Sequence, residues 1–291
     1  MHSHCTVSSS ILDGSTLEHG IIKGVDFLSV FAVLDPKGAI ALAERGLMFH
    51  AVLFMLIVAV PVYILLFFFA WRYRTGNTKA AYAPHWEHSK MEELIWWAIP
   101  FEIILILGAL TWTSTHDLDP RKTLNVNVAP LVIEVVALDW KWLFLYPEEN
   151  IATVNYVRVP RDKPVRFDIT ADAPMNSFWI PELGGQIYAM TGMITSLNLI
   201  ANEVGEFAGK SANYSGEGFA QMKFTAQATS QENFDAWVAE VKTSSSTLSW
   251  SEYEMLAEPS VTKEPLYYGS VEPNLYNMIV TKFTGLPVPS H

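Results

Sequence analysis

The stretch VLFMLIVAVPVYILLFFFA (residues 52–70) is followed by a second apolar stretch, LIWWAIPFEIILILGALTWT (residues 94–113). No charged residue occurs in residues 46–71, and the second stretch contains one, Glu102. About 20 consecutive apolar residues can cross a hydrocarbon core of about 30 Å as a helix. We therefore predict a transmembrane helical hairpin over residues 45–115.

The connecting loop, residues 72–91, predicts the orientation of this hairpin. It carries four basic residues and a single acid, Glu87. Because cytoplasmic loops are enriched in Lys and Arg, we expect the loop in the cytoplasm. The N-terminal segment, residues 1–44, and everything after the second span are then periplasmic. The basic residues are Arg72, Arg74, Lys79 and Lys90.

Composition supports a membrane protein and excludes several kinds of site. Half of the 291 residues are hydrophobic and only 17% are charged, which indicates that part of the chain lies in lipid. The net charge of −11 argues against a nucleic-acid partner, which would require a basic face. The single cysteine, Cys5, cannot form an internal disulfide or a cysteine-based metal centre. We interpret Cys5 as an ordinary thiol, with lipid attachment as the alternative.

Residues 120–229 change from continuous apolar runs to alternation of apolar and polar residues. Ile133, Val135 and Ala137 follow this period of two. Several short strands separated by Pro, Gly, Asn and Asp predict an antiparallel β-sandwich or barrel. The further strands that we expect lie at residues 153–159, 164–170, 194–200 and 219–228.

Residues 230–291 have the apolar spacing of short helices. Phe234, Trp237 and Val238 recur at intervals of three and four, and similar patterns begin at Ser251 and Asn274. We expect a helical C-terminal arm that packs on the sandwich or on a partner.

Four longer blocks resemble subunit II of the haem-copper oxidases. In that family a two-span hairpin precedes an outer domain with the cupredoxin fold, so the resemblance implies a cupredoxin-like sandwich here. The resemblance covers nearly all of the chain from Val33 onward. The blocks are VLDPKG (33–38), ALDWKWLFLYPEENIATVNYV (137–157), APMNSFWIPELGGQIYAMTGM (173–193) and SANYSGEGFAQMKF (211–224).

The resemblance also bears on copper. In the cytochrome c oxidase branch of this family, two His, two Cys, one Met and a Glu carbonyl hold a dinuclear copper centre. None of those side-chain ligands is present at the matching positions here, so the resemblance implies the copper-free quinol oxidase branch. We interpret Met175, Met190, Met193 and Met222 as packing residues rather than thioether ligands. The matching positions hold Asn176, Tyr214, Gly216, Gly218, Met222 and Thr225.

The function that the resemblance implies is that of subunit II of a terminal respiratory quinol oxidase in the bacterial inner membrane. Such a complex couples ubiquinol oxidation to reduction of O2 to water and to proton translocation. The chain would hold no redox centre, whereas subunit I would hold the haems and one copper. Subunit I would be the main partner, with subunits III and IV, and no cytochrome c would dock. Two alternatives are a copper-bearing cytochrome c oxidase subunit, which the missing ligands oppose, and a membrane-anchored scaffold or binding module without oxidase activity.

Two glutamates on the second span receive different interpretations. Glu93 lies seven residues before Pro100, a spacing that in related oxidases marks the entry of a proton path. Glu93 and the neighbouring Glu92 would equally suit the N-terminal turn of a helix. Glu102 lies at mid-membrane, on the side of the helix opposite Glu93. We interpret Glu102 as a neutral acid hydrogen-bonded to a neighbouring subunit or to a backbone carbonyl.

Three further positions follow from the same blocks. Trp140 and Trp142 match an aromatic pair of the family, and we expect them to pack in the core. Lys141 between them would point to solvent or to subunit I. Ser29 lies where quinol oxidase relatives carry a lipidated cysteine, so the resemblance does not extend to that lipid site.

Overall fold

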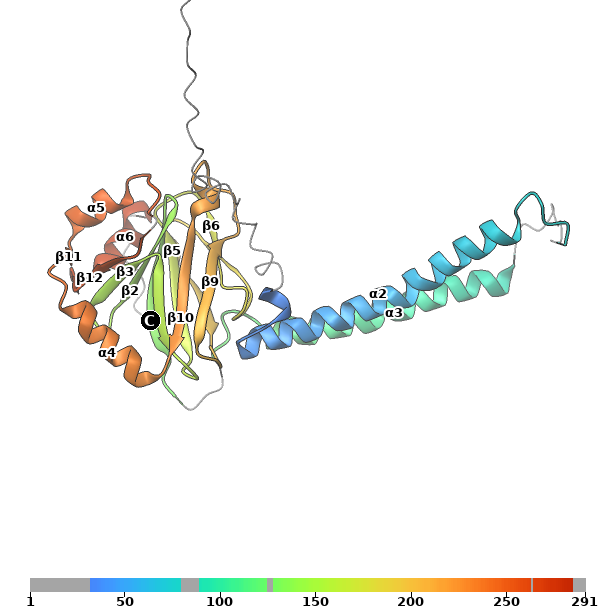
Figure 1. Cartoon of the computed structure of the whole chain (residues 1–291), viewed down its shortest axis with the longest axis horizontal. Helices are drawn as coiled ribbons and strands as arrows, with labels where there is room; N and C mark the ends of the chain where they lie inside the picture. Colours follow the sequence, from blue (N-terminus) through green and yellow to red (C-terminus); the bar gives the residue numbers. More distant parts are fainter. Residues whose placement is uncertain (1–31, 80–88, 125–127, 263, 285–291) are drawn as a thin grey trace, which may run out of the picture.

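The computed structural model describes residues 32–79, 89–124, 128–262 and 264–284. Cys5, Ser29, Glu87 and the loop residues 80–88 lie outside this description. Within it, the chain forms a helical hairpin, a two-sheet sandwich and a C-terminal arm (Figure 1). This is the architecture that the sequence predicts.

The hairpin consists of α2 (Ala39–Arg72) and α3 (Lys90–Asp117), which run side by side away from the sandwich (Figure 1). Each contains a proline, Pro61 and Pro100, without ending there. Their most apolar windows have mean hydropathies of 2.9 and 2.0 and contain no residue buried within the chain. Apolar helices without a protein cover suit lipid or another membrane subunit.

The sandwich has two sheets. The six-stranded sheet has the order β12-β3-β2-β1-β5-β8, and the five-stranded sheet has the order β4-β10-β9-β6-β7. The strands before the arm are β1 (Leu131–Leu138), β2 (Lys141–Tyr146), β3 (Ile151–Val154), β4 (Tyr156–Pro160), β5 (Val165–Ala171), β6 (Asn176–Trp179), β7 (Ile187–Ala189), β8 (Thr195–Leu199), β9 (Gly205–Ser211) and β10 (Lys223–Thr229).

The expected all-antiparallel pairing is wrong. β1 pairs with β5 in parallel, and β4 pairs with β10 in parallel, whereas the other pairings of these two sheets are antiparallel. Between β1 and β5 the chain forms β2 and β3 and then crosses to the other sheet as β4. Parallel neighbours in a sheet require such a crossover connection. Because the chain crosses over through β4, β5 returns beside β1 in the same direction.

Two expected strands differ in extent. The strand expected at 153–159 divides into β3 and β4, because Asn155 adopts a left-handed conformation with φ 57°. Its side-chain Oδ1 accepts from the Trp142 backbone N–H at 2.9 Å, and its Nδ2 donates to the Thr262 carbonyl. The strand expected at 219–228 begins instead with a 3-10 turn, η2 (Phe219–Gln221), and becomes extended only from Lys223.

Aromatic rings fill the space between the sheets. Trp142 and Phe144 from one sheet meet Phe178 and Phe224 from the other, with the Phe178 and Phe224 ring centroids 5.0 Å apart. All four side chains are buried. Ile133, Val135 and Ala137 belong to the same core, as their alternation predicts.

The C-terminal arm is helical and also contributes strands. Its helices are α4 (Gln231–Lys242), α5 (Trp250–Ala257) and α6 (Leu275–Thr284), and its strands are β11 (Thr247–Leu248), β12 (Leu266–Tyr268) and β13 (Ser270–Val271). β12 adds to the six-stranded sheet beside β3, which periodicity did not predict. Tyr253, Tyr276 and Ile279 pack on the outer face of that sheet, against Val136 and Leu143 among others. Both faces of β1 are therefore covered.

The VLDPKG block joins the hairpin to the sandwich. The backbone N–H groups of Lys37 and Gly38 donate to the Glu182 carbonyl at 2.8 and 3.2 Å, and the Asn202 N–H donates to the Lys37 carbonyl. The Lys37 ammonium lies 3.0 Å from a carboxylate oxygen of Glu203. The hairpin is thus held by backbone hydrogen bonds to two loops of the sandwich.

Candidate functional site

The end of the sandwich where the copper-matching positions gather is built from three elements. The turn between β1 and β2 contributes Trp140, β6 begins with Asn176, and the connection from β9 to β10 runs through residues 212–222. This connection lies at the upper edge of the sandwich as drawn (Figure 1). Distant parts of the sequence are therefore brought together here.

Asn176 is fully buried, and both ends of its amide are hydrogen-bonded. Its Nδ2 donates to the Pro174 carbonyl at 2.8 Å, and its Oδ1 accepts from the Ser211 hydroxyl at 2.6 Å. The neighbouring Ser177 hydroxyl donates to the side chain of Asn213. These bonds fasten β6 to the β9–β10 connection, so Asn176 is a structural residue of the loop rather than a free ligand.

Trp140 fills the space over the two glycines of the connection. A Cβ atom on Gly218 would lie 2.2 Å from Cδ2 of Trp140, and one on Gly216 would lie 3.3 Å from its Cζ2. Gly216 also has φ of 107°, which favours glycine. The Trp140 Nε1 donates to the Ser215 carbonyl at 3.0 Å. An indole therefore packs where the resemblance places cysteine and carbonyl ligands of copper.

The remaining matching positions differ in exposure. Tyr214 is 78% exposed, and its ring meets Phe219 at a centroid distance of 5.7 Å. Met222 is buried, whereas Thr225 lies within β10 opposite Tyr156. Met222 thus packs in the core, whereas Met175 and Met193 are about half-exposed within this chain, and their interpretation as packing residues stays a prediction.

This set of donors does not fit a dinuclear copper centre. Thiolates are the ligands that suit such copper, and the whole chain has one cysteine, Cys5. Within the described residues, no group of three or more His, Cys, Asp or Glu side chains could hold a metal ion. The residues at this end hold the β9–β10 connection in place by hydrogen bonds and aromatic packing.

Lys141 corrects a second expectation. Its side chain is buried against the arm rather than directed to solvent, and its Nζ donates to the Glu258 carbonyl at 2.8 Å and to the Ser260 hydroxyl at 2.6 Å. Burial lowers the pKa of this ammonium, because desolvation opposes the charged form. Trp142 is in the core as expected, although its buried Nε1 has no hydrogen-bond partner among the described residues.

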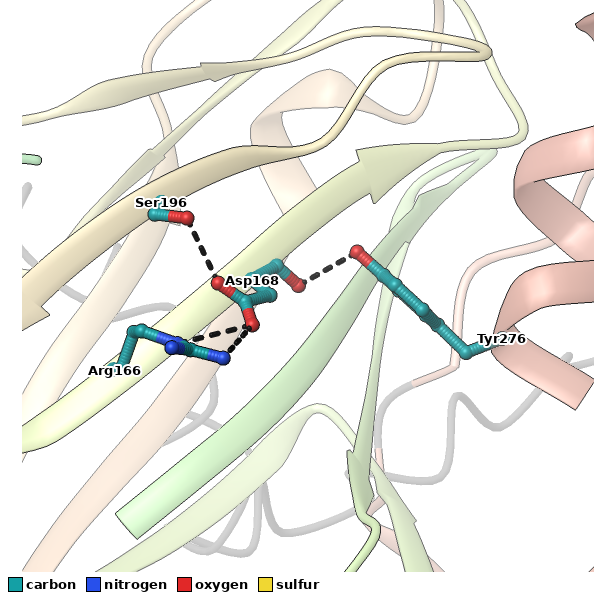
Figure 2. A network of polar contacts seen from close by, with 4 residues as sticks. All are labelled: Arg166, Asp168, Ser196 and Tyr276. Atoms are coloured by element: carbon teal, nitrogen blue, oxygen red, sulfur yellow. Dashed lines mark hydrogen bonds and ion pairs between the residues drawn. The ribbon is translucent and has the colours of Figure 1, made fainter. Parts of the chain in front are cut away.

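Two polar clusters that the sequence did not indicate lie where the arm covers the sheet. The Asp172 carboxylate accepts from the Tyr253 hydroxyl at 2.6 Å and from the Lys282 ammonium at 2.8 Å. Asp168 accepts from Arg166 and from Ser196, and its backbone carbonyl accepts from the Tyr276 hydroxyl (Figure 2). In the sequence, Asp168 and Asp172 appear only as acids within or beside a strand of alternating pattern. A solvent-exposed face of the sheet would explain such acids equally well.

Glu93 and Glu102 lie on α3, far from these clusters. Glu93 is exposed in the first turn, at the end of the hairpin remote from the sandwich (Figure 1). The helix is capped by Ser89, whose hydroxyl accepts from the Glu92 N–H. Glu102 is exposed near the middle of α3. The chain does not bring the two glutamates together.

Comparison with known proteins places this architecture in a family. Residues 144–229 match the model of the cytochrome c oxidase subunit II periplasmic domain, and residues 242–285 match the COX aromatic rich motif. Cytochrome bo(3) ubiquinol oxidase subunit 2 of Pseudomonas putida is 53% identical over 263 residues, which cover 90% of this chain and 84% of the relative. The chain belongs to the ubiquinol oxidase subunit 2 family. Ubiquinol oxidase subunit 2 of Acetobacter aceti is 49% identical over 254 residues, covering 86% and 82% of the two chains.

One solved structure is similar to part of the chain. The periplasmic domain of subunit II of cytochrome oxidase from Bradyrhizobium japonicum covers 40% of this chain and 95% of its own, with 23% identity and a TM-score of 0.38. The family that the sequence blocks resemble is therefore confirmed by the subunit 2 relatives. The aromatic motif corresponds to the arm that covers the six-stranded sheet.

Proposed function

We propose that the chain is the copper-free second subunit of a ubiquinol oxidase that reduces O2 to water and translocates protons. Two findings together carry this proposal. Relatives that are about 50% identical are subunit 2 of ubiquinol oxidases. The positions that match the copper ligands hold Asn176, Met222 and a glycine loop over which Trp140 packs. Without copper ligands, the domain has no means of relaying electrons from a soluble cytochrome. Electrons would reach the haems and the single copper of subunit I directly from quinol.

The role of the chain in that complex is structural. The hairpin offers an uncovered apolar surface to subunit I and, with it, subunits III and IV. The junction at Lys37 and Gly38 fixes the sandwich relative to the hairpin, so the domain caps the membrane subunits on one side. The loop rich in Lys and Arg supports a periplasmic location for this domain, in a bacterial inner membrane.

Oxygen uptake tests the proposal. Membranes from cells that lack this chain, and from the same cells with the chain restored, are supplied with ubiquinol or with reduced cytochrome c. Restored uptake with ubiquinol alone is expected. Uptake with reduced cytochrome c would contradict the copper-free function, and unchanged uptake without the chain would favour a scaffold outside the oxidase.

Glu93 is proposed as the proton-entry carboxylate of the hairpin. It lies exposed in the first turn of α3, where a carboxylate can exchange protons with water. Glu92 shares that turn and serves as the matched control. Glu93→Gln is expected to slow quinol-driven oxygen uptake, whereas Glu92→Gln leaves it unchanged; equal effects of the two changes would assign both residues to the helix terminus instead.

A further inference from the structure

A cavity lies between the outer face of the six-stranded sheet and the C-terminal arm. One wall comes from β1, β2 and the start of β3, and the other comes from residues 271–277, which lead into α6. Its volume is about 210 Å³, and a water molecule takes about 30 Å³ of liquid, so it has room for about seven waters. A small organic molecule of about six to eight non-hydrogen atoms would fill this space.

Glu134 projects into this cavity from β1. It alternates with the core residues Ile133 and Val135, and it therefore lies on the same face of the strand as Val136, which the arm covers. Glu134 makes no hydrogen bond or ion pair with any residue that the structure describes. A carboxylate shielded from water is costly unless a positive or hydrogen-bonding group meets it. Glu134 therefore lacks a partner within the described chain.

The neighbours of Glu134 add negative charge to the cavity. Its register partner Asp168 is a second acid, and the Asp168 carboxylate is 2.8 Å from Arg166, with which it forms an ion pair (Figure 2). Glu272 lines the cavity from the arm, and one of its carboxylate oxygens accepts from the Trp250 N–H at 2.6 Å. No Lys, Arg or His is among the described residues that line the cavity. Two carboxylates thus share a cavity that supplies no cation.

The walls between these two carboxylates are largely apolar and aromatic. Leu145 and Ile151 line the cavity from the sheet, and Tyr276 lines it from α6, with its hydroxyl already bonded to the Asp168 carbonyl. Calcium takes about six to eight oxygen ligands, and leucine and isoleucine side chains supply none. An organic cation instead packs its carbon chain on such walls, and an aromatic ring attracts its charge. The cavity therefore suits an organic cation better than a metal ion.

We propose that this cavity binds a short aliphatic diamine, with one ammonium group at Glu134 and the other at Glu272. The chain of four or five carbons lies against Leu145 and the ring of Tyr276. Its two positive charges balance the two carboxylates, and its length connects the wall formed by the sheet to the wall formed by the arm. The bound molecule links β1 to the arm. This binding does not depend on the oxidase function proposed above.

The affinity for the diamine is expected to rise with pH. Burial, and then the charge of Asp168, raise the pKa of Glu134 to about 7, so an ammonium group that binds there displaces a proton. The other groups around the cavity are Glu272, the ion pair on β5 and two tyrosines, Tyr146 and Tyr276, which stay neutral because burial raises their pKa. Aliphatic amines remain charged up to about pH 10. The affinity should therefore increase about tenfold from pH 6 to pH 8.

Calorimetric titration of the full-length chain in detergent tests the site with ligands of matched length. The probe is 1,4-diaminobutane, and 1,4-butanediol is the uncharged control. The diamine is expected to bind and the diol is not, because the diol brings no charge to the carboxylates. Equal binding of the two, no binding of the diamine at millimolar concentration, or displacement of the diamine by calcium would overturn the proposal.

Three matched variants assign the binding to the cavity. Glu134→Gln and Glu272→Gln are each expected to weaken diamine binding about tenfold or more, and Glu134→Gln should also remove its dependence on pH. Glu254→Gln, at an exposed acid of α5 that does not line the cavity, is the control and should bind as the unchanged chain does. Thermal unfolding verifies that each variant is folded. Equal loss in all three variants would indicate attraction by net charge alone, and unchanged binding in the first two would exclude the cavity; either result would contradict the proposal.

Discussion

At the scale of single residues, the most perturbed carboxyl with a clear cause is Glu134. It projects from β1 toward the arm, beside its register partner Asp168 on β5. It lines a cavity of about 210 Å³ that Glu272 and Tyr276 also line. Burial, and then the negative charge of Asp168, raise its pKa to about 7. The ion pair of Asp168 is with Arg166.

Glu134 makes stability depend on pH in a predictable direction. A carboxyl whose pKa is raised in the folded state binds more protons there than in the unfolded state, so its contribution is complete below about pH 4.5 and is lost as pH rises through 7. The free energy of unfolding is expected to fall by up to about 3 kcal/mol across this window. Glu134→Gln should remove that part of the pH dependence in thermal unfolding of the detergent-solubilised chain. Identical pH profiles of the two proteins would contradict the assignment.

Lys141 provides a second prediction at this scale. Lys141→Met keeps the volume of the side chain but removes the hydrogen bonds that the buried Lys141 ammonium donates to the Glu258 carbonyl and to the Ser260 hydroxyl. We expect a loss of about 1–3 kcal/mol in the free energy of unfolding. Lys223→Met, at an exposed position of β10, is the control and should change stability little. A loss as small as that of the control would contradict a role for Lys141 in stabilising the arm against the sheet.

At the scale of elements, the arm is held by a polar clamp as well as by apolar packing. Asp172, at the end of β5, joins Tyr253 of α5 to Lys282 of α6, and its carboxylate side chain is only 7% exposed. Burial, and then hydrogen bonding to the Asp172 carboxylate, raise the pKa of the Tyr253 hydroxyl. One carboxylate therefore ties together two helices that are separate in sequence.

Asp172→Ala is expected to loosen the arm before the sandwich. The change leaves a buried tyrosine hydroxyl without its acceptor and should destabilise the arm by about 2–4 kcal/mol. Hydrogen exchange should accelerate in α5 and α6 while β9 and β10 retain their protection. Uniform acceleration in both sheets would indicate that the arm and the sandwich unfold as one unit.

The junction between hairpin and sandwich depends on Gly38. A Cβ atom there would lie 2.6 Å from the Ile200 carbonyl oxygen and 2.8 Å from that of Leu183, and backbone atoms cannot move aside easily. Gly38→Ala should therefore destabilise the junction by about 1–3 kcal/mol and increase cleavage by protease near residues 35–38. Gly46→Ala is the matched control, because a Cβ atom there meets nothing within 4 Å. Equal cleavage of both variants would contradict this role.

At the scale of the whole molecule, the sequence predicts what depends on local patterns. The spans follow from apolar runs, and the core face of β1 follows from alternation at Ile133 and Val135. The parallel pairing of β1 with β5 and the addition of β12 could not be predicted, because strand partners are chosen by non-local packing. Lys141 shows the same limit, since its acceptor Glu258 lies 117 residues away along the chain.

The same distinction applies to the candidate site. The residue types at the copper-matching positions predict that the copper ligands are missing. The identity of a side chain alone decides whether it can bind copper. That Trp140 would occupy the space over Gly218 could not be read from spacing, since it depends on a left-handed turn at Trp140 itself, with φ of 63°. The sequence thus predicts the fold and the family. The packing of Trp140 on the β9–β10 connection is visible only in the three-dimensional structure.

The measurement that tests the central claim most directly is the copper content of the purified complex that contains this chain. The complex is isolated from native membranes in mild detergent, and copper and haem are quantified together. The account predicts a single copper per complex, because none is held by the sandwich. Two additional coppers per complex would contradict it, since the sandwich would then hold a dinuclear centre.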